Sequence, residues 1–283
     1  MPRRDLWQRY RKNRAALLGL SVFGVVAVTA IVGPLLYTSD PWALATRPFL
    51  WPGDQRSFPL GSDAMGRDVL AGLIHGAWVS LLIGLAATAA SVGIGTTVGA
   101  LAGYFSGWVD DVLMRLTEVF QTIPNFIFVI VLVTIFKPAI RTIVLAIAIV
   151  SWPPIARLVR AEFLTLRRRE FVQACIVLGM TETRIIWRQI LPNCLAPVVV
   201  FGSIMVATAI LVEAGLAFLG LGDPNVMSWG KMIGDGRGAL RTAWYLSAIP
   251  GVAILLTVLS LNLVGEGLND ALNPRIDQRG RRF

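Results

Sequence analysis

The chain has 283 residues, of which 55% are hydrophobic and only 15% are charged, and its mean hydropathy is +0.66. These values exclude an ordinary water-soluble domain and favour a protein that crosses the membrane several times. The net charge of +9 would also suit a nucleic-acid-binding protein. However, the basic residues lie within a few helical turns of apolar stretches, where membrane proteins carry them, so we expect no nucleic-acid partner.

Six apolar stretches predict an all-α fold with six membrane-spanning helices. A helix needs roughly 20 apolar residues to cross a hydrocarbon core about 30 Å thick, and most of the stretches are long enough or nearly so. Residues 142–156 form a shorter stretch, which Arg141 and Arg157 can extend because long basic side chains reach the membrane surface. Pro124 should kink the third helix. The expected spans are residues 15–37, 80–102, 109–136, 142–156, 190–212 and 242–265.

The distribution of basic residues predicts the orientation of these helices. If the chain starts in the cytoplasm, most of its 26 Lys and Arg residues fall on the cytoplasmic side, as the positive-inside rule requires. Both termini are then cytoplasmic, and the first span is not a signal peptide because its apolar run is longer than a typical h-region. The expected parts are a cytoplasmic tail (1–14), the first span (15–37), an outer loop (38–79), a core of five spans (80–272) with a cytoplasmic loop (161–193), and a second tail (273–283).

Small residues on the second span predict a close helix contact. Gly95, Gly99 and Gly103 recur at intervals of four and therefore lie on one helix face. Because glycine weakens a helix, a glycine row that merely faced lipid would be unfavourable. We expect another helix to approach this face closely.

The sequence contains no pattern typical of catalysis, nucleotide binding or a metal site. It has a single histidine, His75, and no cluster of His, Cys and acidic residues with metal-ligand spacing. It also lacks a glycine-rich loop that ends in Gly-Lys-Ser or Gly-Lys-Thr, and it lacks a Gly-x-Ser-x-Gly motif. We therefore expect a protein that is not an enzyme and that binds no metal or nucleotide itself.

A polar segment lies between the fourth and fifth spans. Glu170 can begin a helix because the helix dipole favours a carboxylate in the first turn, and Gly179 can end it in the left-handed conformation. Thr181 then caps a second helix, residues 182–191, which Pro192 ends. Two interpretations remain open: an interfacial helix on anionic lipid, which the neighbouring arginines favour, and a helix that docks on a partner protein.

Several motifs resemble one family of transport proteins. Glu170 is followed by Ala174 and Cys175, where the family's Glu-x-x-x-Ala-Ala motif has two alanines, then by Gly179 and by Ile-Leu-Pro at residues 190–192. The motifs PLGSDAMGRDVLAGLIHGA, SWPPIARLVRAEFLTLRRREFVQA, EAGLAFLGLGDPNVMSWGKMI and LNDALNPR occur in the family's order along the chain. The chain therefore resembles the C-type permease subunits of bacterial ABC importers for dipeptides, oligopeptides and nickel.

This resemblance implies a type I importer fold in the bacterial cytoplasmic (inner) membrane. Such a permease pairs with a second homologous permease, and the pair associates with two cytoplasmic ABC ATPase subunits and an extracytoplasmic substrate-binding protein. ATP and magnesium are bound by the ATPase subunits, so no cofactor is expected on this chain. Which peptide, thiol, chelate or opine is carried stays open. The alternative functions are a secondary transporter, although no inverted repeat is visible, and a membrane scaffold whose polar segment lies on lipid.

The resemblance assigns the polar segment to coupling with the ATPase. The residues expected to couple are Glu170, Phe171, Ala174, Cys175, Leu178, Gly179 and Met180. A carboxylate at Glu170 can pair with a basic residue of the ATPase, and Gly179 sets the angle between the two helices.

Polar residues within the spans are candidates for the substrate pathway. A polar or ionisable side chain in a membrane costs free energy, so such residues are rare and usually have a function. The candidates are Glu118, Gln121, Asn125 and Glu213. The alternatives are a structural kink in the third span and, for Glu213, a helix end that already lies in the water-rich interface. Trp229 is expected to anchor a short outer helix at the headgroup level, or to contact the binding protein.

Overall fold

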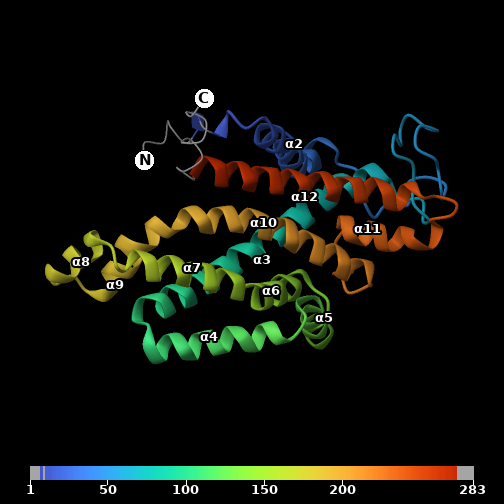
Figure 1. The fold of residues 1–283 in the computed structure, drawn as a ribbon. Helices are drawn as coiled ribbons and strands as arrows, with labels where there is room; N and C mark the ends of the chain where they lie inside the picture. Colours follow the sequence, from blue (N-terminus) through green and yellow to red (C-terminus); the bar gives the residue numbers. More distant parts are fainter. Residues whose placement is uncertain (1–6, 9, 273–283) are drawn as a thin grey trace.

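The structure, a computed structural model, describes residues 7, 8 and 10–272. The rest of the two expected tails, residues 1–6, 9 and 273–283, lies outside the described residues. The described chain is helical and contains no strand, only isolated β-bridges in the long loop after the first helix. The helices form an elongated bundle whose long axis runs horizontally in Figure 1. The all-α prediction is confirmed.

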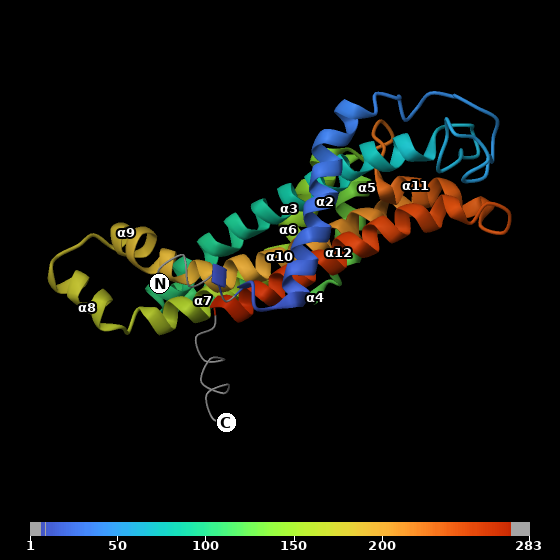
Figure 2. The same ribbon diagram turned by 90° about the horizontal axis from the view of Figure 1, so that it is seen from above.

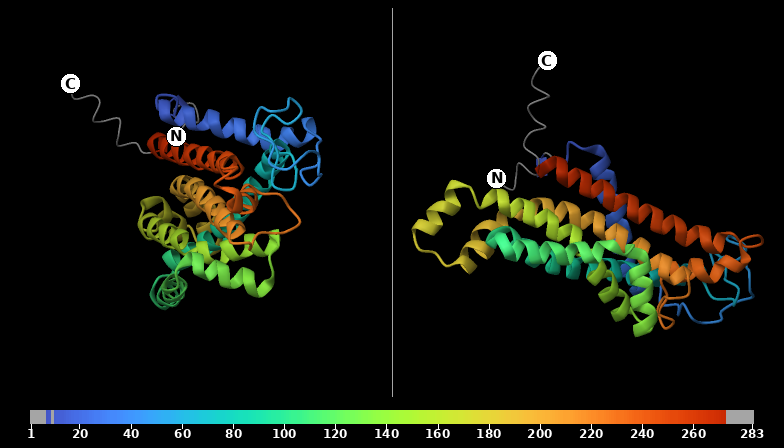
Figure 3. Two further views of the ribbon diagram at one scale, coloured as in Figure 1. Left: turned by 90° about the vertical axis from the view of Figure 1, so that its right-hand side faces the viewer. Right: turned by 60° about the horizontal axis from the view of Figure 1, so that its bottom comes forward.

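The helices follow one another in the order that the apolar stretches predict. They are α2 (Arg14–Leu36), α3 (Val69–Phe105), α4 (Gly107–Thr122), α5 (Asn125–Phe136), α6 (Ile140–Ser151), α7 (Pro153–Leu166), α8 (Glu170–Val177), α9 (Glu182–Arg184), the π-helix η1 (Ile185–Ile190), α10 (Leu191–Phe218), α11 (Trp229–Gly236), the 3-10 helix η2 (Arg237–Ala239) and α12 (Tyr245–Leu272). In Figures 1 and 3, α2 and α12 lie side by side along one edge of the bundle, and α4 lies on the opposite edge.

Four described helices are long and apolar enough to cross a membrane, or six if each bent pair counts as one span. The first bent pair joins α4 to α5 at an angle of 83°. Proline cannot donate the helical hydrogen bond, and it holds the residue before it in an extended conformation; here Ile123 has φ −92° and ψ 131°. The kink expected at Pro124 is therefore a complete break in the helix.

The second bent pair, α6 and α7, corresponds to the short fourth stretch. The two helices meet at Pro153 with an angle of 43° and together cover residues 140–166, which is longer than the expected 142–156. The pair can therefore reach across a bilayer without relying on basic side chains at both of its ends.

The second span is also longer than expected. α3 has 37 residues, which is roughly 55 Å at 1.5 Å per residue and exceeds the hydrocarbon thickness of about 30 Å. It begins at Val69 because the Asp68 side chain accepts a hydrogen bond from the Leu70 N–H and so caps the helix. Residues 69–79, which we expected to be part of the outer loop, are therefore helical.

The glycine face of α3 packs closely on α7, as predicted. A Cβ atom at Gly95 would lie 2.7 Å from the Ile155 Cβ and from the Trp152 carbonyl oxygen, and one at Gly103 would lie 2.6 Å from the Phe163 Cβ. Such distances leave no room for a side chain, so the two helix backbones approach each other more closely than larger residues would allow.

The loop between α2 and α3 (residues 37–68) folds over the end of the bundle opposite to α8 and α9 (Figure 2). Its backbone is fixed to α12 because the Tyr245 hydroxyl donates to the carbonyl oxygens of Leu50 and Ser62, both at 2.8 Å. At the start of the loop, the Tyr37 hydroxyl donates a hydrogen bond to the Asp68 carboxylate. The loop is therefore a folded part of the protein.

Candidate functional site

The polar segment projects from one end of the bundle as two short helices, α8 and α9 (Figures 2 and 3). α8 begins at Glu170, because Arg169 before it is extended with φ −75° and ψ 147°. Glu170 lies in the first turn, where the helix dipole stabilises a carboxylate. The helix ends at Val177, and Leu178 is its C-cap residue.

The turn after α8 has the hydrogen bonds of a Schellman motif. The Gly179 N–H donates to the Ile176 carbonyl at 3.0 Å, and the Met180 N–H donates to the Cys175 carbonyl at 3.1 Å. Gly179 has φ +72°, which a residue without a Cβ adopts at little cost. The predicted left-handed conformation at Gly179 is confirmed.

The second helix of the segment differs from the prediction. Thr181 occupies the N-cap position, but its side chain makes no capping hydrogen bond. Only residues 182–184 are α-helical, and a π-helix, η1, follows and continues without interruption into α10. Pro192 therefore does not end the helix. It lies in the first turn of α10, and the π turn before it has a different bonding pattern, in which the Leu191 N–H donates to the Ile186 carbonyl five residues earlier.

The side chains of α8 divide between an inner and an outer face. Val172 is fully buried and packs with Ile185 and Ile186 of η1, and Cys175 and Met180 are partly buried against the same cluster. These contacts hold α8 against η1 and the ends of α3 and α7. Cys175 and Met180 pack against this cluster and keep part of their surface exposed.

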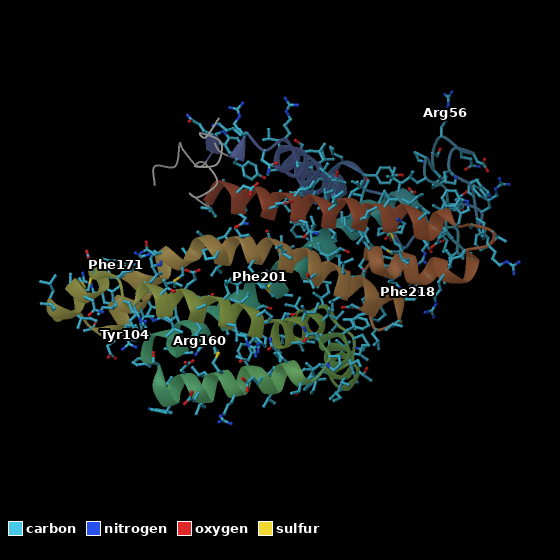
Figure 4. All side chains as sticks on the ribbon, in the orientation of Figure 1. Arg56, Tyr104, Arg160, Phe171, Phe201 and Phe218 are labelled. Carbon is cyan, nitrogen blue, oxygen red and sulfur yellow. The ribbon has the colours of Figure 1, made fainter. Side chains whose placement is uncertain are left out.

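The opposite face of α8 and its turn expose apolar side chains. The exposed fraction is 78% for Leu178, 87% for Val177 and 39% for Phe171, and Glu170 and Ala174 are also exposed. Phe171 lies at the projecting end of the molecule in Figure 4. Clustered exposed apolar residues beside a charged rim are typical of a protein-binding surface.

Val177 was not among the residues expected to couple. It lies seven residues, about two helical turns, after Glu170 and therefore on the same face of α8. This spacing could have identified it from the sequence.

Polar contacts join the base of this segment to the spans. The Arg160 guanidinium of α7 makes a bidentate ion pair with the Asp110 carboxylate of α4, and Arg160 is labelled in Figure 4. The Arg167 side chain donates to the Ser106 hydroxyl at 3.0 Å and lies over the Tyr104 ring at 5.4 Å. These contacts connect the chain that leads into the projecting segment with α3, α4 and α7.

A second candidate site is a cavity of about 150 Å³ among α3, α5, α6, α7 and α10. Its polar lining consists of Thr88, Ser91, Asn125, Ser151 and Thr208. The Thr88 hydroxyl is buried and has no hydrogen-bond partner among the described residues. The cavity can therefore offer uncharged hydrogen-bonding groups to a solute within the span region.

The four residues predicted for the pathway do not come together. Of these, Asn125 alone lines the cavity. Glu118 and Gln121 are exposed on α4. Glu213 is 1% exposed and accepts a hydrogen bond from the Ser80 hydroxyl at 3.5 Å, so it is not a helix end in a water-rich interface. The hydroxyl residues of the cavity could not be identified from the sequence, because a serine or threonine in an apolar helix usually bonds its own backbone.

Trp229 lies inside the protein. The expected short helix, α11, is present, but Trp229 is only 2% exposed and its Nε1 donates to the Leu73 carbonyl of α3 at 2.9 Å. The prediction that the Trp229 ring anchors α11 by contact with lipid headgroups, and the alternative that it contacts the binding protein, are both wrong, because the ring is enclosed between α11 and α3.

The sequence matches two family models. One, described as the binding-protein-dependent transport system inner membrane component, covers residues 95–278. The other, described as the N-terminal TM domain of oligopeptide transport permease C, covers residues 2–55. The chain belongs to the binding-protein-dependent permease family. The predictions of a transport permease in the inner membrane are therefore confirmed, and the alternatives of a secondary transporter and a scaffold are not favoured.

Curated relatives resemble this permease over nearly its whole length. The dipeptide transport system permease DppC of Haemophilus influenzae is 37% identical and covers 98% of this chain and 96% of its own. The di/tripeptide permease DppC of Pseudomonas aeruginosa is 38% identical, with coverage of 97% and 93%. The oligopeptide permease OppC of Escherichia coli is 39% identical, with coverage of 96% and 92%.

The fold also resembles a solved transporter. An inward-facing structure of the MetNI methionine ABC transporter contains a chain that superposes with a TM-score of 0.58 at 17% identity, over 71% of this permease and 97% of that chain. At this identity the likeness establishes the ABC importer permease fold alone. Membership of the family implies ATPase and substrate-binding partners for the permease. The family is a transport permease component and not a family of enzymes.

Proposed function

We propose that this permease forms half of the pathway of a peptide importer and pairs with one homologous permease, two ATPase subunits and one binding protein. The relatives named for dipeptide, di/tripeptide and oligopeptide transport support peptides as the substrate class. The uncharged hydroxyl and amide lining of the cavity also fits substrates that share a peptide backbone and differ in side-chain charge.

The observation that carries the proposal is the exposed face of α8. Leu178 and Val177 can enter an apolar cleft of an ATPase, and Glu170 can pair with a basic residue beside that cleft. Ala174 lies between them on the same side of α8 and allows close approach because its side chain is small. Gly179 fixes the direction of α8 relative to the spans.

The helix that follows α9 supports transmission of a movement across the membrane. Residues 182–218 form one continuous helix of 37 residues that runs from the projecting segment along the bundle toward α11. Closure of the ATPases would therefore displace α10 along with α8. α10 lines the cavity through Thr208, so its displacement would change the shape of the pathway.

For the pathway we propose Asn125 together with the hydroxyl residues of the cavity. Glu118 and Gln121, which are exposed on α4, are proposed to face the second permease across the pathway. Glu213 is proposed to join α10 to α3 through Ser80, because its carboxylate is enclosed and does not line the cavity.

Transport should depend on the partner subunits. The sequence has no nucleotide-binding loop, so the purified permease in liposomes should take up no labelled tripeptide, with or without ATP. Addition of the second permease, the ATPases and the binding protein should give uptake that requires ATP. Uptake by the permease alone would contradict the proposal and would support a secondary transporter.

The bundle should have both ends of its chain and the α8–α9 segment in the cytoplasm. This prediction can be tested in a variant in which Cys175 and Cys194 are replaced by alanine. A cysteine at Asp54, in the α2–α3 loop, should react with a membrane-impermeant thiol reagent in whole spheroplasts, and a cysteine at Thr181 should react after lysis only. Both positions are exposed in the structure. The opposite labelling pattern would refute this orientation.

A further inference from the structure

An apolar groove lies where α2 begins and α12 ends, at the same end of the bundle as α8 (Figure 1). Its volume is about 330 Å³. Its walls include Trp7, Tyr10, Leu20, Val264, Leu268 and Leu272. The groove is on the outer surface of the bundle, because α2 contributes the neighbouring Leu18 with 59% of its surface exposed and Trp7 is 52% exposed.

The aromatic wall of the groove is held by specific contacts. The Tyr10 hydroxyl donates to the Ala16 carbonyl at 3.1 Å, and the Trp7 ring stacks on the Tyr10 ring with 6.0 Å between centroids and 7° between planes. Gly267 of α12 permits this arrangement, since a Cβ there would lie 2.9 Å from the Tyr10 ring. The groove is therefore a preformed feature of the α2–α12 contact.

Three basic residues lie beside the groove in the sequence. Arg11, Lys12 and Arg14 follow the aromatic wall directly in the chain, and all three side chains are exposed. Of the acidic residues at this end of α12, Asp270 accepts a hydrogen bond from the Asn13 side chain at 3.0 Å, and Glu266 is exposed. An apolar groove with three adjacent cations is complementary to a ligand with an acyl chain and an anionic headgroup.

The position of the groove relative to the membrane identifies such a ligand. The first residues of a membrane-spanning helix lie at the headgroup level, where tryptophan and tyrosine are favoured and where lysine and arginine attract anionic lipids. We propose that the groove binds an acyl chain of an anionic phospholipid, such as phosphatidylglycerol, and that Arg11, Lys12 and Arg14 bind its phosphate. The lipid belongs to the leaflet that faces the α8 end of the bundle.

Photo-crosslinking in proteoliposomes that contain the assembled importer tests this site. Phosphatidylglycerol with a diazirine in its acyl chain should label peptides that contain Trp7 or residues 264–272. Excess unlabelled phosphatidylglycerol should suppress this labelling, and excess phosphatidylcholine with the same chains should not.

Two kinds of variant distinguish the contribution of the basic residues, which bind the headgroup, from that of the groove, which binds the acyl chain. Replacing Arg11, Lys12 and Arg14 by glutamine should lower labelling by on the order of tenfold or more, because each basic residue adds to the attraction. The matched control, glutamine at the exposed Arg115, Arg184 and Arg188, removes the same charge elsewhere and should label normally. Leu268→Trp should fill the groove and abolish labelling; if this variant fails to accumulate, the charge variants, which leave the packing intact, decide the test.

Three results would overturn the proposal. Equal competition by phosphatidylcholine would show that the headgroup is not recognised. Normal labelling of the glutamine variant would show that the three cations do not bind the phosphate. Labelling that appears only after removal of residues 273–283 would show that the chain's own tail occupies the groove.

Discussion

Replacing Gly99 with valine should prevent the permease from accumulating as a folded subunit. A Cβ at this position would lie 2.8 Å from the Val159 Cβ and would also overlap the Ala156 carbonyl oxygen of α7. Overpacking of a core typically costs about 1–3 kcal/mol, and here the obstacle includes backbone atoms, which cannot rotate away. The α3–α7 contact should therefore be lost, as measured by the yield of monodisperse protein and its thermal unfolding midpoint.

Gly93 provides a matched control on the same helix. A Cβ at Gly93 would meet no atom within 4 Å, and valine in a helix is more favourable than glycine. Gly93→Val should therefore accumulate at the wild-type level with an unchanged or slightly higher unfolding midpoint. If Gly93→Val and Gly99→Val are equally impaired, the close approach of α3 and α7 is not the cause.

Gly179→Val should leave a complex that assembles but no longer couples ATP hydrolysis to uptake. No atom lies within 4 Å of a Cβ at Gly179, so the substitution acts through the backbone alone. A Cβ at φ +72° costs roughly 1–2 kcal/mol, which lowers the population of the native turn about 5- to 30-fold. Peptide uptake by the assembled complex should fall correspondingly, whereas Gly179→Asn, which tolerates this conformation, should retain most of it.

Gly220 is the control for a general loss of stability. It has φ +82°, no atom lies within 4 Å of its Cβ position, and it follows α10 at the opposite end of the bundle. Gly220→Val should incur the same backbone penalty, yet the ATPase subunits should respond to substrate as in the wild type. Equal uncoupling by the valine variants at Gly179 and Gly220 would show that the turn after α8 has no special part in coupling.

Four described helices, or six if each bent pair is one span, can cross a membrane. The lengths of the apolar stretches predict where these helices lie, because a helix needs roughly 20 apolar residues to cross the bilayer. These lengths do not predict where α3 begins. Residues 69–79 contain two glycines and His75, and they pack on α11: the Gly72 and Gly76 positions contact Met232 and Trp229. The Asp68 N-cap is a local signal for the start of α3, whereas the contact with α11, which is remote in the chain, is not.

In the candidate site, too, features that depend on neighbouring residues could be predicted, and features that depend on distant contacts could not. The turn at Gly179 could be predicted because a Schellman motif depends on neighbouring residues alone. The π-helix before Pro192 could not be predicted, because the local rule for proline is that it ends a helix. Here the burial of Ile185, Ile186 and Ile190 in one core cluster favours a continuous helix. The enclosed position of Glu213 likewise depends on Ser80, which is remote in sequence.

The most direct test of the account is the substrate-stimulated ATPase activity of the assembled complex with Glu170→Lys. If α8 docks on the ATPase, the reversed charge should abolish stimulation while the complex still assembles. Glu182→Lys, an equal charge change at an exposed position on α9, should leave stimulation intact. If α8 instead lies on anionic lipid, the added positive charge should strengthen that contact and leave coupling unchanged. Stimulation at the wild-type level in the Glu170→Lys complex would contradict the assignment of α8 to ATPase coupling.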